Sequence, residues 1–282
     1  MHVLRSSQGE HDDYFNGLLE GKTWGEPQEE GTTKKSGAER EFPSALRIAF
    51  KREKLDFKIV KKESDPATKY ELFQRLNTLG TSLSPQEVRN CLLIMINREL
   101  YQWLADLATF GPFQRTIALS EKQLDERYDV ELALRFIVLL KSSTEELKDK
   151  PDIGEFLTEQ MKLFALDKTF DRKGIGEDFK ETFKLVEKVL QDQAFRRFDA
   201  KKKRFMGGFS ISAYEVIAVG VGANVTKWKV RISHSPEWKT PFLEIVQGLW
   251  ADATFLKYSG SGVRASTRLP NLIPLGRRIF KP

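Results

Sequence analysis

Apolar and polar residues follow a helical period over most of the chain from residue 65 onward. Apolar residues recur there at three- and four-residue spacing, the pattern of helices that bury one face. This pattern predicts helices over 65–80, 84–107, 121–142, 152–166 and about 176–204, and further helices near 210–219, 236–252 and 269–281. No repeat of fixed period joins these segments, which argues against a solenoid.

Two of these helices begin at recognisable capping boxes. In Ser84-Pro85-Gln86-Glu87 the hydroxyl can accept a hydrogen bond from the Glu87 amide while the Glu87 carboxylate accepts from the Ser84 amide. Ser120 and Gln123 repeat the arrangement. The apolar face of the first helix is expected to consist of Val88, Cys91, Leu92, Met95 and Ile96, and to continue through Leu100, Trp103, Leu104 and Leu107.

The middle of the core is expected at 135–140, which is apolar all round, with Glu131 and Arg135 spaced for an ion pair within the helix. A second apolar stripe runs along the long helix through Phe179, Phe183, Val186 and Leu190.

The N-terminal quarter has a different pattern. Residues 1–41 are acidic and rich in glycine, without a helical or strand period. Two strand-like runs follow at 45–50 and 55–60, separated by a charged turn, and the second alternates with the period of a half-buried strand. The expected fold class is therefore α+β but mainly α, with residues 1–64 forming one part and residues 65–282 a helical domain.

Composition limits the classes of protein. The 282 residues are 40% hydrophobic and 30% charged, which is typical of a globular protein. A single cysteine, Cys91, excludes an internal disulfide and fits a reducing compartment. The longest apolar run is far shorter than a membrane span and the N-terminus lacks a secretory pattern, so we expect a cytoplasmic protein without membrane contact.

The net charge of +6 conceals an asymmetry. Residues 1–45 contain five Lys and Arg against nine Asp and Glu, whereas residues 195–282 contain sixteen against five, a net +11. A basic segment of this size is the electrostatic signature of a phosphate-bearing partner, although such surfaces also occur on proteins that never bind nucleic acid. DNA is the partner that we expect.

Few residues offer catalytic chemistry. The three histidines have no clustered ligands, so no metal site is expected. The glycine pairs 174/176 and 220/222 lack the rest of a dinucleotide loop and are interpreted as turns or helix ends. Asp56 and Lys58, with Glu41 upstream, loosely imitate a metal-dependent nuclease, but a solvated strand face explains them better. The catalytic residues stay unknown.

Two basic groups are candidate phosphate ligands. The run Lys201, Lys202, Lys203 and Arg204, with Arg196 and Arg197 before it, is interpreted as either a charged helix end or a grip on phosphates. In the glycine- and serine-rich segment 259–268, Arg264 and Arg268 flank small residues that expose backbone amides. That segment is either a phosphate-binding loop or a surface loop.

The segment 71–90, Glu-Leu-Phe-Gln-Arg-Leu-Asn-Thr-Leu-Gly-Thr-Ser-Leu-Ser-Pro-Gln-Glu-Val-Arg-Asn, resembles the signature of the N-terminal domain family of GmrSD restriction endonucleases. The resemblance extends over residues 42–282. It implies a ParB/sulfiredoxin-like α+β core followed by helices, in restriction or anti-phage defence proteins that bind or hydrolyse nucleotide with Mg²⁺ and cleave DNA.

The same resemblance implies ligand-pocket roles for Arg75, Asn77, Glu87, Arg89 and Asn90, with the two arginines best suited to an anionic ligand. Glu87 and Asn77 have alternative roles, as a helix cap and a helix end respectively.

The family's Asp-Gly-x-Gln-Arg motif, its preceding Gln-Arg segment and its histidine-rich nuclease half are absent from this sequence. We therefore expect a truncated or split member, of which residues 1–64 are the remnant of the ParB-like core. Such a chain would be inactive alone and served by a separate nuclease or N-terminal subunit. The alternative is a non-enzymatic helical protein that binds nucleic acid or docks a partner.

Overall fold

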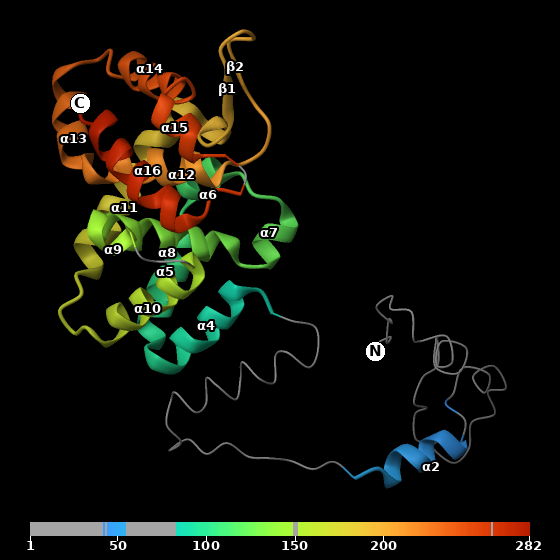
Figure 1. Ribbon diagram of the computed structural model, residues 1–282. Coiled ribbons are helices and arrows are strands. Elements are labelled where there is room, and N and C mark those ends of the chain that lie inside the picture. Colours follow the sequence, from blue (N-terminus) through green and yellow to red (C-terminus); the bar gives the residue numbers. More distant parts are fainter. Residues whose placement is uncertain (1–41, 43, 55–82, 149–151, 261) are drawn as a thin grey trace, which may run out of the picture. The chain divides into compact units, whose positions relative to one another are not determined.

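The computed structural model describes residues 42, 44–54, 83–148, 152–260 and 262–282 (Figure 1). The chain divides into two compact units, residues 1–62 and residues 63–282. Within the described residues the protein is mainly helical, with one two-stranded antiparallel sheet. None of the helices in these ranges has both the length and the apolar character needed to cross a membrane.

In the first unit the described element is helix α2, Ser44–Arg52. The strand expected at 45–50 was therefore wrong. Leu46, Ile48 and Phe50 alternate as in a strand, yet they are 37%, 50% and 71% exposed and pack no sheet face. Alanine, leucine, arginine and lysine favour helices, and two basic residues at the C-terminus complement the helix dipole. The other expected strand, 55–60, lies outside the described residues.

The second unit contains a series of helices and the hairpin. The helices are α4 (Pro85–Ile96), α5 (Arg98–Ala108), α6 (Gly111–Ile117), α7 (Glu121–Asp125), α8 (Tyr128–Lys141), α9 (Thr144–Lys148), α10 (Ile153–Leu166), α11 (Arg172–Leu190), α12 (Ile211–Ala223), α13 (Val225–His234), α14 (Lys239–Leu249), α15 (Ala253–Tyr258) and α16 (Ala265–Ile279). A 3-10 turn, Gln191–Gln193, and strands β1 (Arg197–Asp199) and β2 (Arg204–Met206) lie between α11 and α12.

Both capping boxes are confirmed. Ser84 Oγ accepts from the Glu87 amide at 3.2 Å and Glu87 Oε2 accepts from the Ser84 amide at 2.7 Å. The Ser84 capping box starts α4, which is shorter than expected because Asn97 ends α4 and begins α5. Its Oδ1 accepts from the Leu100 amide at 3.0 Å, and its Nδ2 donates to the carbonyl of Ala165 at 3.0 Å.

The buried face of α4 also differs from the expected one. Gln86, Arg89 and Asn90 are buried beside Leu92 and Leu93. In contrast, Val88 and Cys91 are half-buried, and Met95 is 40% exposed. The polar residues face inward because distant helices supply their partners, as described below.

The centre of the core is formed by α8, α11 and α12. Residues 136–139 are buried, and so are Phe179, Phe183, Val186 and Leu190 of α11, which confirms both expected stripes. The ring of Phe113 lies 4.7 Å from that of Phe183. Arg277 of α16 closes the end of α8 by donating to the carbonyls of Leu139, Leu140 and Ser142.

Helices α12 and α16 cross at very short range (Figure 1). A Cβ on Gly220 would lie 2.5 Å from the carbonyl oxygen of Gly276, and a Cβ on Gly276 would collide with the carbonyl of Val216. Only glycine at both positions allows this approach. The glycine pairs noted in the sequence lie in the first turns of α11 and the last turn of α12.

Two further expected helices are interrupted. The segment 121–142 forms α7 and α8, separated where Arg127 takes a left-handed φ of 58°. The long helix expected to reach residue 204 ends at Leu190, where Gln191 has a φ of 49°. The basic run 201–204 is therefore on the β1–β2 hairpin, and its interpretation as a helix end was wrong.

Candidate nucleic-acid interface

The β1–β2 hairpin stands out from the helices of the second unit (Figure 1). Its strands pair antiparallel, with Arg197 opposite Met206, Phe198 opposite Phe205 and Asp199 opposite Arg204. Phe198 and Phe205 share one face, with ring centroids 5.1 Å apart. Cross-strand aromatic pairs of this kind stabilise a two-stranded ribbon that has no third strand to support it.

The turn of the hairpin is shaped by Asp199. Its Oδ1 accepts from the backbone amides of Lys201 at 2.9 Å and Lys202 at 3.0 Å. These bonds, the one from Lys202 first, hold the pKa of the Asp199 carboxyl below its usual value. Lys203 completes the turn with a left-handed φ of 51°. The Asp199 carboxylate thus fixes the backbone of the turn, and the lysine side chains extend from this turn.

The hairpin displays cations. Arg197, Lys201, Lys202, Lys203 and Arg204 are all exposed. Within the described part of the chain, no ion pair involves any of residues 201–204. Four adjacent cations on one projecting turn give a concentrated positive field that is available to an anionic partner.

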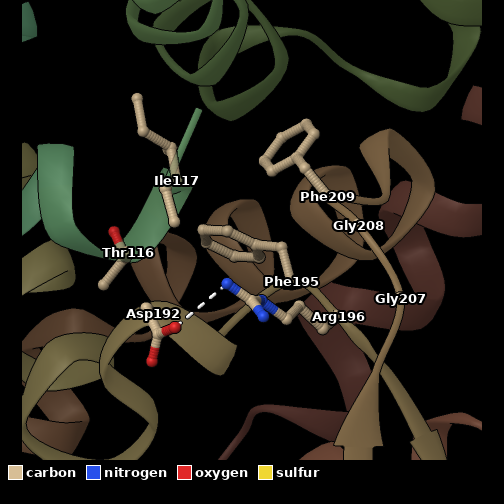
Figure 2. A pocket seen from close by; sticks show the side chains of 9 residues that line it. Thr116, Ile117, Asp192, Phe195, Arg196, Gly207, Gly208 and Phe209 are labelled. Atoms are coloured by element: carbon tan, nitrogen blue, oxygen red, sulfur yellow. Dashed lines mark hydrogen bonds and ion pairs between the residues drawn. The ribbon is translucent and has the colours of Figure 1, made fainter. Parts of the chain in front are cut away.

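A hollow of about 290 Å³ lies at the base of the hairpin (Figure 2). Phe195 and Arg196 border it just before β1, and Gly207, Gly208 and Phe209 border it just after β2. Across from the hairpin it is closed by the end of α6, residues 116–118. Arg196 Nη2 donates to Asp192 Oδ2 at 3.0 Å on the rim.

The glycine- and serine-rich loop has a different role from the hairpin. Arg268 points inward, where its Nε donates to Glu215 Oε2 at 2.8 Å and its Nη2 to Glu215 Oε1 at 3.0 Å. Its Nη1 also holds the carbonyl of Val263 at 3.3 Å. Arg264 is exposed at the N-terminus of α16. No hydrogen bond or ion pair of the described residues joins this loop to residues 201–204.

Arg268 is the end of a buried ionic chain. Glu215, with 0% exposure, also accepts from Arg135 Nη1 at 2.8 Å. Arg135 Nη2 donates to Glu131 Oε1 at 2.7 Å, which confirms the expected pair within the helix, and Glu131 also binds Arg89. Three arginines and two glutamates are thus joined across α4, α8, α12 and α16. Burial alone would lower the pKa of Arg135, but the two carboxylates together raise it above its usual value.

Three polar signature residues, Gln86, Arg89 and Asn90, are buried and join this polar interior. Arg89 Nε donates to Gln86 Oε1 at 2.8 Å, and Gln86 Nε2 donates to Asn90 Oδ1 at 2.7 Å. Glu87 is part of the capping box. Arg75 and Asn77 lie outside the described residues. The structure therefore brings Arg89, Asn90 and Arg268 into a polar interior and leaves 201–204 and Arg264 exposed.

The sequence interpretation missed Asp192, Phe195 and Phe209 at the hollow, and the inward role of Glu215. The one local signal was the Gly207–Gly208 doublet, a marker of turns that favours a hairpin end over a helix. No group of three or more His, Cys, Asp or Glu side chains in the described ranges is placed to hold a metal ion.

Comparisons with known proteins give no match. The sequence matches no family model, no curated protein resembles it significantly, and no solved structure shares its fold at a significant level.

Proposed function

We propose that the chain is a nucleic-acid-binding helical part of a restriction or anti-phage defence protein of the GmrSD N-terminal-domain type, and that the β1–β2 hairpin binds the phosphate backbone. The observation that carries the binding role is the exposed turn of Lys201, Lys202, Lys203 and Arg204, which has no acidic partner among the described residues outside the hairpin. The resemblance of segment 71–90 supports the class of protein.

Phosphate binding fits the physics of the hairpin. Lysine ammonium groups are strongly hydrated point charges that suit a diffuse array of phosphates. Each phosphate that they neutralise releases condensed counterions, which supplies affinity without reading sequence. A projecting ribbon can follow a groove or a strand, whereas cations on a flat surface contact fewer phosphates.

The proposal includes no catalytic step by this chain. Any nucleotide-dependent or Mg²⁺-dependent cleavage would belong to the complete protein or to a separate subunit, because the family's motif is absent from this sequence.

The test is binding of a labelled DNA duplex, measured by fluorescence anisotropy across a range of salt concentrations. The wild-type chain should bind without strong sequence preference, and log Kd should rise steeply with log salt. Replacing Lys201, Lys202, Lys203 and Arg204 by alanine should flatten the slope by about 0.9 for each phosphate that the variant no longer neutralises, and should weaken binding at ~50 mM salt by roughly tenfold per phosphate.

A matched variant controls for the loss of charge. Lys141, Lys168, Lys173 and Lys180 are exposed lysines outside residues 195–282, and replacing them by alanine removes the same four charges. That variant should keep nearly all of the affinity and the slope. Equal reductions of affinity in both variants, or no binding by the wild type at ~50 mM salt, would overturn the proposal. In the second case an acidic protein partner becomes the better interpretation of the hairpin.

A further inference from the structure

We propose that the hollow at the base of the hairpin receives one unpaired base of the bound nucleic acid, and that Asp192 and Arg196 select guanine. This inference rests on the proposed function and extends it, because phosphate contacts at the hairpin turn carry no information about the base.

The position of the hollow suits a base that belongs to a strand held by the hairpin. The residues of the hairpin itself form its near wall, since Arg196 precedes β1 and Gly207 follows β2. Three strand residues, about 10 Å, separate the basic turn from this wall. About three phosphates along one DNA strand span the same distance. A strand that contacts the turn would therefore pass the mouth of the hollow.

The size and the walls suit a single planar group. A volume of about 290 Å³ is at the lower limit for sites that enclose a whole small molecule. Phe195 and Ile117, both almost fully buried, make the floor of the hollow rigid, and the half-buried Phe209 borders the hollow with apolar surface that a base can contact. Added Cβ atoms on Gly207 and Gly208 would meet nothing within 4 Å, so the mouth on that side is open space beside bare backbone.

The charged pair on the rim provides the selectivity. Figure 2 shows Arg196 and Asp192 joined beside the ring of Phe195. A carboxylate is an acceptor only, with two adjacent oxygens. Guanine is the one common base whose Watson–Crick edge presents two adjacent donors, N1–H and N2–H. Its O6 and N7 are the acceptors that arginine binds best. Adenine and cytosine each place an acceptor where the carboxylate would need a donor.

A second hollow has room for the rest of the nucleotide. It is about 610 Å³ in volume, adjoins the first at Ala118 and Asp192, and is lined also by Arg115 and Lys188. These cations can bind a sugar–phosphate group whose base occupies the first hollow. Arg115 is paired with Glu187, so Lys188 is the residue better placed to meet a phosphate.

The experiment compares single-stranded oligothymidines that carry one central guanine, adenine or cytosine. The wild-type chain should bind the guanine oligomer about tenfold more tightly than the others, the discrimination expected for one bidentate contact. Asp192→Asn exchanges one acceptor for a donor, so it should abolish the ratio of affinities between the guanine oligomer and plain oligothymidine. Loss of the negative charge beside the basic hairpin raises both affinities together and leaves that ratio as the measure of selectivity. Asp125→Asn, an exposed aspartate on α7, is the matched control and should keep the preference.

A second measurement distinguishes binding in the hollow from binding at the hairpin turn. Guanosine 5′-monophosphate and adenosine 5′-monophosphate are titrated into the wild type, Asp192→Asn and the alanine variant of 201–204, and binding is followed by calorimetry. Binding of the guanosine nucleotide that survives in the hairpin variant and disappears in Asp192→Asn supports the hollow, even if the wild type fails to bind duplex DNA. If the wild type binds oligonucleotides without a guanine preference and binds neither mononucleotide, the guanine hollow is wrong and the proposed function stands. Thermal unfolding midpoints equal to that of the wild type would show that a variant that loses binding is still folded.

Discussion

Single residues of this chain obey local rules wherever their partner is three or four positions away. Ser84 with Glu87, Ser120 with Gln123, and Glu131 with Arg135 were all predictable from spacing, and all three pairs form. The rule fails when the partner is distant. Arg89 is buried because Glu131 reaches it from 42 positions away, and nothing in its own neighbourhood signals this.

Ser84→Ala should lower the free energy of unfolding by about 1 kcal/mol, the usual cost of removing an N-cap side chain. The substitution removes the bond from the Glu87 amide and also the bond that Ser84 Oγ donates to the carbonyl of Glu126 at 3.0 Å. Urea unfolding measures the change. Ser235→Ala, at a C-cap whose hydroxyl makes no hydrogen bond among the described residues, is the control and should shift the midpoint very little. Equal midpoints for the two variants would show that the cap does not stabilise α4.

At the scale of elements, the sequence predicted most helices but not where they break. Asn97, Arg127 and Gln191 end or interrupt helices, and none of them is a glycine or proline that marks a break in a sequence. The basic run 201–204 consists of good helix formers, so its composition favours continuation of the helix before it. The hairpin depends instead on a turn closed by one aspartate and on an aromatic pair across two strands.

Asp199→Ala tests that turn. Removing a negative charge beside four cations would by itself strengthen DNA binding. Removing the two hydrogen bonds from the amides of Lys201 and Lys202 should disorder the turn and so weaken DNA binding. We expect weaker binding, by less than in the alanine variant of 201–204. Asp199→Asn keeps an acceptor oxygen and should bind at least as tightly as the wild type. Stronger binding by Asp199→Ala would mean that the aspartate acts only through its charge.

The same aspartate gives the turn a dependence on pH. The hydrogen bonds to Lys201 and Lys202 lower the pKa of Asp199 in the folded state. The ionised carboxylate therefore stabilises the turn fully above the unfolded-state pKa of about 3.9, and this stabilisation is lost as pH falls through the lower folded-state pKa. The order of the turn should therefore be constant at neutral pH and decline only in acid.

At the scale of the whole molecule, the buried ionic chain connects helices that are far apart in sequence. Glu215 lies 80 positions from Arg135 and 53 from Arg268, so no local pattern could have revealed the pairing. The resemblance implies ligand-pocket roles for Arg89 and Asn90, and these roles stay predictions. The structure shows that both residues lie in the same polar interior. Arg268 was interpreted as a free phosphate ligand because its partner, Glu215, is 53 positions away in the sequence.

Glu215→Gln should lower the free energy of unfolding by about 3–5 kcal/mol, because two buried arginines lose their shared carboxylate. A guanidinium does not lose its proton in proteins, so deprotonation of Arg135 cannot relieve the loss of its partner. Urea unfolding of Glu215→Gln is compared with Glu244→Gln, an exposed glutamate on α14 for which we expect almost no change. A decrease below ~1 kcal/mol would show that the network contributes little beyond the apolar packing around it.

The short crossing of α12 and α16 has a consequence for handling the protein. Residues 216–222 of α12 are a buried, uncharged run of Val, Ile, Ala and Gly without proline, the composition of segments that aggregate when they are exposed. Their cover comes largely from α16, which begins more than forty residues later at Ala265. Fragments that stop before α16 would uncover the side of this run that faces α16, and should collect in inclusion bodies during expression. A soluble fragment for binding studies therefore has to extend through Phe280, the buried residue just after α16.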